Sequence, residues 1–241
     1  TVRDNGPVSV GQQLYIIFQR LGYQVIIPKF RESGRAAISK GCLKLARKYA
    51  VSNVTAARDI IDADTPLIGL EPSCILTFRD EYPDLVPPEM RESALKVAEN
   101  CLLYDEFFMR EAAAGRITPD MFKNDRCEIW LHGHCHQKAL VGIDKTASML
   151  KLLKGAAVHV IPSGCCGMAG SFGYEKEHYR TSIAIGEMVL FPAVRKAMAD
   201  APEGVPTFIA APGTSCRQQI FDGTGIKAVH PVVIIDRMLK P

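Results

Sequence analysis

The stretch Ser163-Gly-Cys-Cys-Gly-Met-Ala-Gly-Ser-Phe-Gly173 carries two adjacent cysteines, Cys165 and Cys166. Its glycines recur at every third position, namely Gly164, Gly167, Gly170 and Gly173. A loop with so few side chains lets the backbone approach a bulky group and turn its N–H groups toward it. Paired thiolates beside such donors suit an iron–sulfur cluster, whose irons bind thiolate and whose sulfurs accept hydrogen bonds. We therefore interpret the first three glycines as cofactor-binding backbone around the cysteine pair.

The sequence on either side of this loop alternates short apolar runs with helical patterns. Buried strands are predicted over residues 24–28, 66–70, 128–132, 158–161 and 206–210. Helices are predicted over residues 14–21, 38–49, 91–114, 138–154 and 175–200. The strand runs are continuously apolar, as strands of a parallel sheet are, and the alternation predicts an α/β fold with mostly parallel sheets flanked by helices.

The two halves of the chain resemble each other in the order of their elements and loops. Glu32 and Ser33 take the places that Cys165 and Cys166 take later, and Cys74 corresponds to Cys216. Two tandem pseudo-repeated units are the simplest explanation. We expect a first unit over residues 1–120, which has lost the cysteine pair, and a second unit over residues 121–241, which carries the cysteine cluster.

Four cysteines of the second half share one position relative to the predicted strands. Cys135, Cys165, Cys166 and Cys216 each follow the carboxyl end of a strand. Loops at that edge of an open parallel sheet converge on one crevice, so four thiolates would meet there. They would hold an iron–sulfur cluster of the four-cysteine type or a tetrahedral zinc ion. The alternative is that they are buried small hydrophobic residues, which is how we interpret Cys42, Cys101 and Cys127.

Histidines surround the first of these cysteines in His132-Gly-His-Cys-His-Gln137. One interpretation is that these side chains cap the following helix and bond to nearby backbone. The other is that His134 or His136 is a ligand, or a hydrogen-bond donor, of the cluster or zinc ion.

Composition limits the remaining possibilities. The 241 residues carry a net charge of +3, which makes no case for nucleic acid, and no apolar run reaches the roughly 18 residues of a membrane span. Eight cysteines without an export signal favour reduced thiols and metal binding in the cytoplasm. Because residue 1 is Thr rather than Met, we expect the sequence to be part of a longer protein. A strained disulfide between the adjacent cysteines would instead indicate a thiol–disulfide catalyst.

These motifs resemble those of the cysteine-rich CCG domain family. That domain occurs in a subunit of heterodisulfide reductase, in the iron–sulfur subunits of glycolate and lactate oxidases, and in large FAD-linked 2-hydroxy-acid dehydrogenases of the D-lactate and D-2-hydroxyglutarate type. The matching segments are closest to the last group, and they are Glu71-Pro-Ser-Cys74, Arg79-Asp-Glu-Tyr82, Gly133-His-Cys135, Gly164 to Gly170, Ser215-Cys-Arg217, Gly223-Thr-Gly225 and His230-Pro231.

The resemblance implies electron transfer. A flavin domain oxidises a 2-hydroxy acid, and the iron–sulfur part passes the electrons to a quinone or a ferredoxin-like carrier. Family members with a non-cubane cluster use five cysteines that end in Cys-x-x-Cys, whereas this chain has Gln219 at the last position. The resemblance therefore implies at most one cluster, held by four thiolates in the second half.

The leading hypothesis is an electron-transfer domain with one cluster, of the 4Fe-4S kind. FAD would lie on a partner domain or subunit, and the protein would be cytoplasmic or peripheral at the inner face of the membrane. The alternative is a zinc-binding structural or docking module without redox activity.

Overall fold

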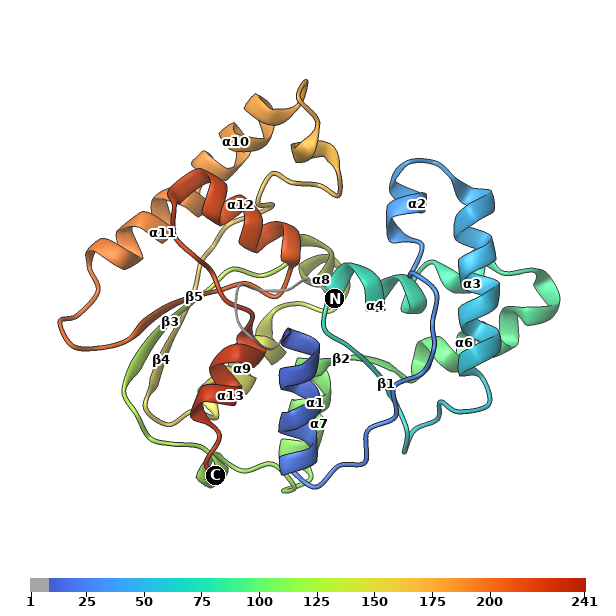
Figure 1. Cartoon of the computed structure of the whole chain (residues 1–241), viewed down its shortest axis with the longest axis horizontal. Coiled ribbons are helices and arrows are strands. Elements are labelled where there is room, and N and C mark those ends of the chain that lie inside the picture. Colours follow the sequence, from blue (N-terminus) through green and yellow to red (C-terminus); the bar gives the residue numbers. More distant parts are fainter. Residues whose placement is uncertain (1–8) are drawn as a thin grey trace. The chain divides into compact units, whose positions relative to one another are not determined.

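The computed structural model describes residues 9–241, and these divide into two compact units. The larger unit combines the first 25 residues, described from residue 9, with Phe108–Pro241, and the smaller unit is Ile26–Phe107. Each unit contains one small parallel sheet flanked by helices (Figure 1). The predicted α/β class with parallel sheets is confirmed.

The sheet of the larger unit has three parallel strands in the order β4-β3-β5. These are β3 (Cys127–Leu131), β4 (Ala156–Val160) and β5 (Thr207–Ala210), and they run side by side in Figure 1. The chain passes from β3 to one neighbour and then crosses to the other side of β3. Such a reversal of strand order opens a crevice at the carboxyl ends of the strands. The loops that follow the three strands meet there.

Helices and an apolar core surround this sheet. The helices of the larger unit are α1 (Val10–Arg20), α8 (Cys135–Leu140), α9 (Asp144–Lys151), α10 (Tyr179–Met188), α11 (Leu190–Ala199), α12 (Thr214–Thr224) and α13 (Pro231–Met238), with the short 3₁₀ helices η2 (Pro119–Met121) and η3 (Phe172–Tyr174). Phe191 and Val194 of α11 pack with Ile209 of β5 and Ile220 of α12 in one buried cluster. Burial of these side chains is the main stabilising contribution to the unit.

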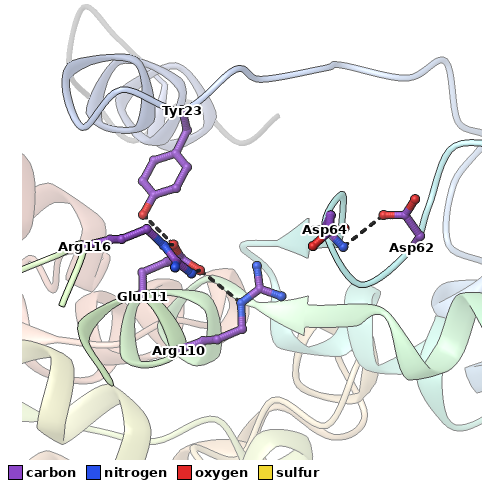
Figure 2. Close-up of polar contacts among 6 residues, drawn as sticks. All are labelled: Tyr23, Asp62, Asp64, Arg110, Glu111 and Arg116. Carbon is purple, nitrogen blue, oxygen red and sulfur yellow. Dashed lines mark hydrogen bonds and ion pairs between the residues drawn. The ribbon is translucent and has the colours of Figure 1, made fainter. Parts of the chain in front are cut away.

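A buried carboxylate joins the segment after α1 to α7 (Tyr104–Ala113). Glu111 is 2% exposed, and its oxygens accept hydrogen bonds from the Tyr23 hydroxyl at 2.7 Å and from Arg110 Nε at 3.1 Å. Arg116 adds a two-pronged contact to the same carboxylate (Figure 2). Because of these bonds, from Arg116 above all, the pKa of Glu111 is lowered to about 2.

The smaller unit is built on two parallel strands, β1 (Leu67–Gly69) and β2 (Cys101–Leu103). Its helices are α2 (Arg35–Ser39), α3 (Leu43–Ala57), α4 (Pro72–Arg79), α5 (Tyr82–Leu85) and α6 (Arg91–Glu99), with the 3₁₀ helix η1 (Pro88–Met90). The fully buried Asn53 side chain bonds to the backbone of Arg31 and Glu32 and to the Tyr82 hydroxyl. After α3, the Asp62 carboxylate accepts the backbone N–H of Asp64 at 3.0 Å and closes a turn (Figure 2).

Several element predictions need correction. Residues 24–28 form no strand, and the exposed fractions of Ile26 and Ile27 are 56% and 76%, so no sheet covers them. The helix predicted over residues 38–49 is interrupted because Gly41 adopts the left-handed conformation, with φ of 71°. Cys42 then stands at the N-cap of α3 and is exposed, so its interpretation as core is wrong. The helix predicted over residues 91–114 is divided by β2.

The other strand predictions are confirmed within a residue or two as β1, β3, β4 and β5. Cys101 and Cys127 are buried as expected, in β2 and β3. The assignment of residues 1–120 and 121–241 to two repeats stays a prediction, because compact units report contacts and not ancestry.

Candidate metal centre

The four predicted cysteines lie on three loops that follow the three strands of the larger sheet. Cys135 is the first residue of α8, four residues after the end of β3. Cys165 and Cys166 follow β4, and Cys216 lies in the first turn of α12, after β5. The strand order of the sheet brings these loops to one edge, as the sequence predicts.

The four thiol groups contact one another in a chain. The side chain of Cys165 bonds to those of Cys135 and Cys166, and Cys166 bonds to Cys216. The hydrogen bond from Cys135 holds the pKa of Cys165 well below that of a free thiol, and the bond from Cys166 does the same for Cys216. The same bonds raise the pKa values of the two donors, Cys135 and Cys166. The group therefore holds thiolate at two positions, which is the form that binds metal.

Backbone N–H groups of the glycine-rich loop point at the Cys165 sulfur. The N–H of Gly167 donates to Cys165 Sγ at 3.3 Å, and the N–H of Ala169 lowers the pKa of Cys165 in the same way. Ala169 has φ of 42°, a left-handed conformation that costs free energy in a residue with a side chain. A Cβ atom on Gly167 would overlap the carbonyl oxygen of Ser182, so only glycine fits there. This loop is folded around the thiolate.

The other two glycines of the prediction differ from Gly167. Gly164 is exposed and has open space where a Cβ atom would stand. Gly170 is exposed and left-handed, with φ of 70°. Their role in binding a cofactor stays a prediction.

His134 caps helix α8. Its Nδ1 atom accepts the backbone N–H of His136 at 3.2 Å, which is the capping interpretation of this motif. His134 is buried and its ring packs close to Gly213, where a Cβ atom would overlap the imidazole and come within 3.1 Å of Cys216 Sγ. Direct ligation by His134 or His136 stays a prediction.

His132 belongs to this site, although the sequence motif did not single it out. It follows β3 directly, is 0% exposed, and its Nδ1 atom lies 2.7 Å from Ser163 Oγ. One ligand atom each from His132, Cys166 and Cys216 lie within 4.8 Å of one another. Its place as the first residue beyond the central strand is the signal that would have found it, because such residues face the crevice.

Two basic side chains hold the loops that carry the cysteines. Lys138 Nζ donates to the carbonyl oxygens of Ser163 and Gly164 at 2.5 and 2.6 Å. Arg217, which is 8% exposed, donates to the carbonyl oxygens of Ala211 and Pro212 at 3.0 and 2.8 Å. Carbonyl oxygens tied to cations turn away from the thiolates and leave N–H groups to face them.

The surroundings of the thiol group are apolar. Cys166 and Cys216 are 4% and 2% exposed, and they lie in the same buried cluster as Ile161, Met168 and Ile220. Thiolate sulfur and imidazole nitrogen are the donors that zinc and iron–sulfur clusters take, and hard cations such as Mg²⁺ prefer oxygen. The residues present therefore fit a zinc ion or an iron–sulfur cluster. The described helices include none that is long and apolar enough to cross a membrane.

Comparison with known proteins finds distant homologues across nearly the whole chain, which confirms the resemblance to the D-2-hydroxyglutarate type of dehydrogenase. The chain is 27% identical over 240 residues to one of the subunits of the anaerobic glycerol-3-phosphate dehydrogenase of Escherichia coli (strain K12), which covers 99% of this chain and 57% of that protein. It is 27% identical over 228 residues to D-2-hydroxyglutarate dehydrogenase of the same strain, covering 93% of this chain and 20% of that protein.

The D-2-hydroxyglutarate dehydrogenase of Haemophilus influenzae is likewise 27% identical, over 96% of this chain and 22% of its own length. No protein-family model matches the chain. The chain thus spans little more than half of the first relative and about a fifth of the others.

Proposed function

We propose that this chain is the electron-transfer part of a flavin-linked dehydrogenase, in which Cys135, Cys165, Cys166 and Cys216 hold one iron–sulfur cluster. The observation that carries the proposal is the contact among these four thiol groups, with backbone N–H groups of the glycine-rich loop directed at Cys165. When bound, the cluster would accept and release one electron at a time.

The protein's own residues would bind and shield this group. The thiolates supply the ligands, and the N–H groups of Gly167 and Ala169 stabilise negative charge on Cys165. The apolar neighbours of Cys166 and Cys216 keep water from the inner side of the site. Charge, hydrogen bonds and solvent exposure are the factors through which a protein sets the potential of a cluster.

The flavin and the substrate would belong to a partner domain or subunit. The relatives named above are dehydrogenases of D-2-hydroxyglutarate and of glycerol 3-phosphate, both anionic molecules with a secondary hydroxyl group. We propose that the partner holds FAD and oxidises a substrate of this class, a 2-hydroxy acid in the first instance. A quinone or a ferredoxin-like protein would accept the electrons, with the protein in the cytoplasm or at the inner face of the membrane.

The tandem-repeat interpretation belongs to the same proposal. Cys74 is the third residue of α4 and Cys216 is the third residue of α12, and each helix follows a strand of a parallel sheet. Glu32 and Ser33 stand where the second unit has its cysteine pair. Only the second unit would then hold a cluster.

The test is to measure iron, zinc and acid-labile sulfide in anaerobically purified protein, with its absorption spectrum. We expect about four irons and four sulfides per chain and a brown chromophore. Cys165→Ser should abolish the chromophore. Cys101→Ser is the matched control, because Cys101 is a buried cysteine in β2 of the smaller unit and should leave the spectrum unchanged.

A zinc-binding structural or docking module is the second candidate, and the proximity of His132 to Cys166 and Cys216 favours it. Two thiolates, one imidazole and a third thiolate would make a four-coordinate zinc site. About one zinc per chain, without sulfide and without colour, would establish this candidate and overturn the cluster.

A further inference from the structure

The imidazole of His132 is held in one orientation. Its backbone N–H donates to the carbonyl oxygen of Ala210 at 2.8 Å, which continues the pairing of β3 with β5 beyond the last strand residue. The side chain is 0% exposed, so no solvent reaches the ring. The ring is therefore fixed by both its backbone and its burial.

One ring nitrogen is bonded to the loop that carries the cysteine pair. His132 Nδ1 lies 2.7 Å from the hydroxyl oxygen of Ser163, which is itself buried and stands two residues before Cys165. The carbonyl oxygen of the same Ser163 accepts a hydrogen bond from Lys138. The histidine and the cysteine loop are thus positioned by one serine.

The other ring nitrogen has no hydrogen-bond partner within the described part of the chain, residues 9–241. His132 Nε2 is fully buried, and a buried nitrogen without a partner costs free energy unless something bonds to it. Cys166 and Cys216 supply the sulfur atoms that lie within 4.8 Å of the ligand atom of His132 and of each other. Donor atoms that share one metal ion lie at such separations, because metal–sulfur and metal–nitrogen bonds are about 2.3 and 2.0 Å long.

We infer that His132 Nε2 is a ligand of the metal centre, alongside Cys166 and Cys216, and that Ser163 accepts the Nδ1–H and fixes the tautomer. This inference rests on the proposed function only in taking the thiolates to hold a metal. It assigns a nitrogen ligand to a site that the sequence describes by its cysteines alone. A carboxylate or hydroxyl oxygen on the far nitrogen is the usual way in which proteins orient a ligating histidine.

The main test uses the whole chain, labelled with ¹⁵N-histidine and reconstituted anaerobically with Fe²⁺ and sulfide. Pulsed electron paramagnetic resonance of the reduced cluster should show one strongly coupled histidine nitrogen. His132→Cys should keep the bound iron, lose this coupling, and shift the reduction potential to a more negative value, because thiolate replaces neutral imidazole. His178→Gln is the matched control, since His178 bonds to Glu175 at the start of α10, and it should keep the coupling.

A wild-type protein that holds iron and sulfide without a strongly coupled nitrogen would overturn the inference and leave the cluster proposal standing. So would a coupling that survives in His132→Cys. A protein that takes up zinc and no iron would overturn the cluster proposal. Co²⁺ replacing that zinc would then test the ligand, because its visible bands should move when nitrogen is replaced by sulfur in His132→Cys, and bands that do not move would contradict ligation.

The positioning role of Ser163 has its own measurement. Ser163→Ala should weaken Zn²⁺ binding by the wild-type chain at least about tenfold, as loss of an outer hydrogen bond to a ligating histidine does. Ser171→Ala is the control, because the Ser171 hydroxyl belongs to the same loop and bonds to Glu175 instead. Equal affinities of the two variants would contradict the role of Ser163. A chain that binds neither iron nor zinc would overturn both the proposed function and the inference.

Discussion

The ammonium group of Lys138 lies 2.6 Å from the carbonyl oxygen of Gly164, the residue before the cysteine pair. The same group donates to the carbonyl oxygen of Ser163 at 2.5 Å. One side chain of α8, the helix that begins with Cys135, therefore sets the backbone from which Cys165 projects. The loops after β3 and β4 are coupled through this lysine.

Replacing Lys138 by methionine should loosen the cysteine loop without disturbing the core. We expect Lys138→Met to lower the affinity for Zn²⁺ or the yield of reconstituted cluster by about tenfold, as loss of a group that orients ligands does. The melting temperature should change little, because Lys138 is only half-buried. Lys151→Met, at an exposed lysine at the end of α9, is the control. Equal metal binding by both variants would show that the loop holds its shape without Lys138.

Two glycines of the same loop should respond in opposite ways to alanine. At Gly167 a Cβ atom would overlap the Ser182 carbonyl oxygen, and φ is 101°, so Gly167→Ala should destabilise the protein by about 2 kcal/mol and abolish metal binding. At Gly164 the space is open, so Gly164→Ala should retain both stability and metal. Urea unfolding and metal content measure the two effects. Loss of metal in Gly164→Ala would instead give that residue the direct cofactor-binding role that the glycine spacing predicts.

The convergence of the cysteines could be predicted from the sequence because it depends on topology alone. Each cysteine follows a strand, and strands of a parallel sheet end at one edge, so no knowledge of side-chain packing is needed. The cap formed by His134 is equally local, since its partner is two residues away. Features set by neighbouring residues or by strand order are therefore within reach of the sequence.

The role of His132 depends on contacts that are distant in the chain. Its partner Ser163 is 31 residues away, and the isolation of Nε2 follows from packing among three loops. The short strand β2 was hidden for a similar reason, because three apolar residues between two helices have no pattern of their own. Residues 24–28 mislead in the other direction, since β-branched residues favour a strand only where a sheet edge is available to pair with them.

Glu111 provides a prediction about stability and its dependence on pH. Tyr23, Arg110 and Arg116 face its carboxylate, and its folded pKa of about 2 lies below the ordinary value of 4.5. A lowered pKa stabilises the fold above about pH 4.5, and this contribution is lost as the pH falls from there toward 2. Glu111→Gln should therefore lower the free energy of unfolding by about 2 kcal/mol at pH 7, and by progressively less below about pH 4.5.

Tyr23→Phe tests the same carboxylate from the partner's side. The Tyr23 hydroxyl donates to Glu111, and burial together with this bond raises the pKa of Tyr23 to about 12, so the hydroxyl keeps its proton throughout the range. Losing one hydrogen bond to a charged group should cost about 1.5 kcal/mol at pH 7. Urea unfolding at pH 7, 5, 4 and 3 compares the two variants with the wild type and with Glu203→Gln, at an exposed carboxylate that should have no effect. A deficit of Glu111→Gln that stays constant down to pH 3 would mean that the carboxylate acts through packing and not through its charge.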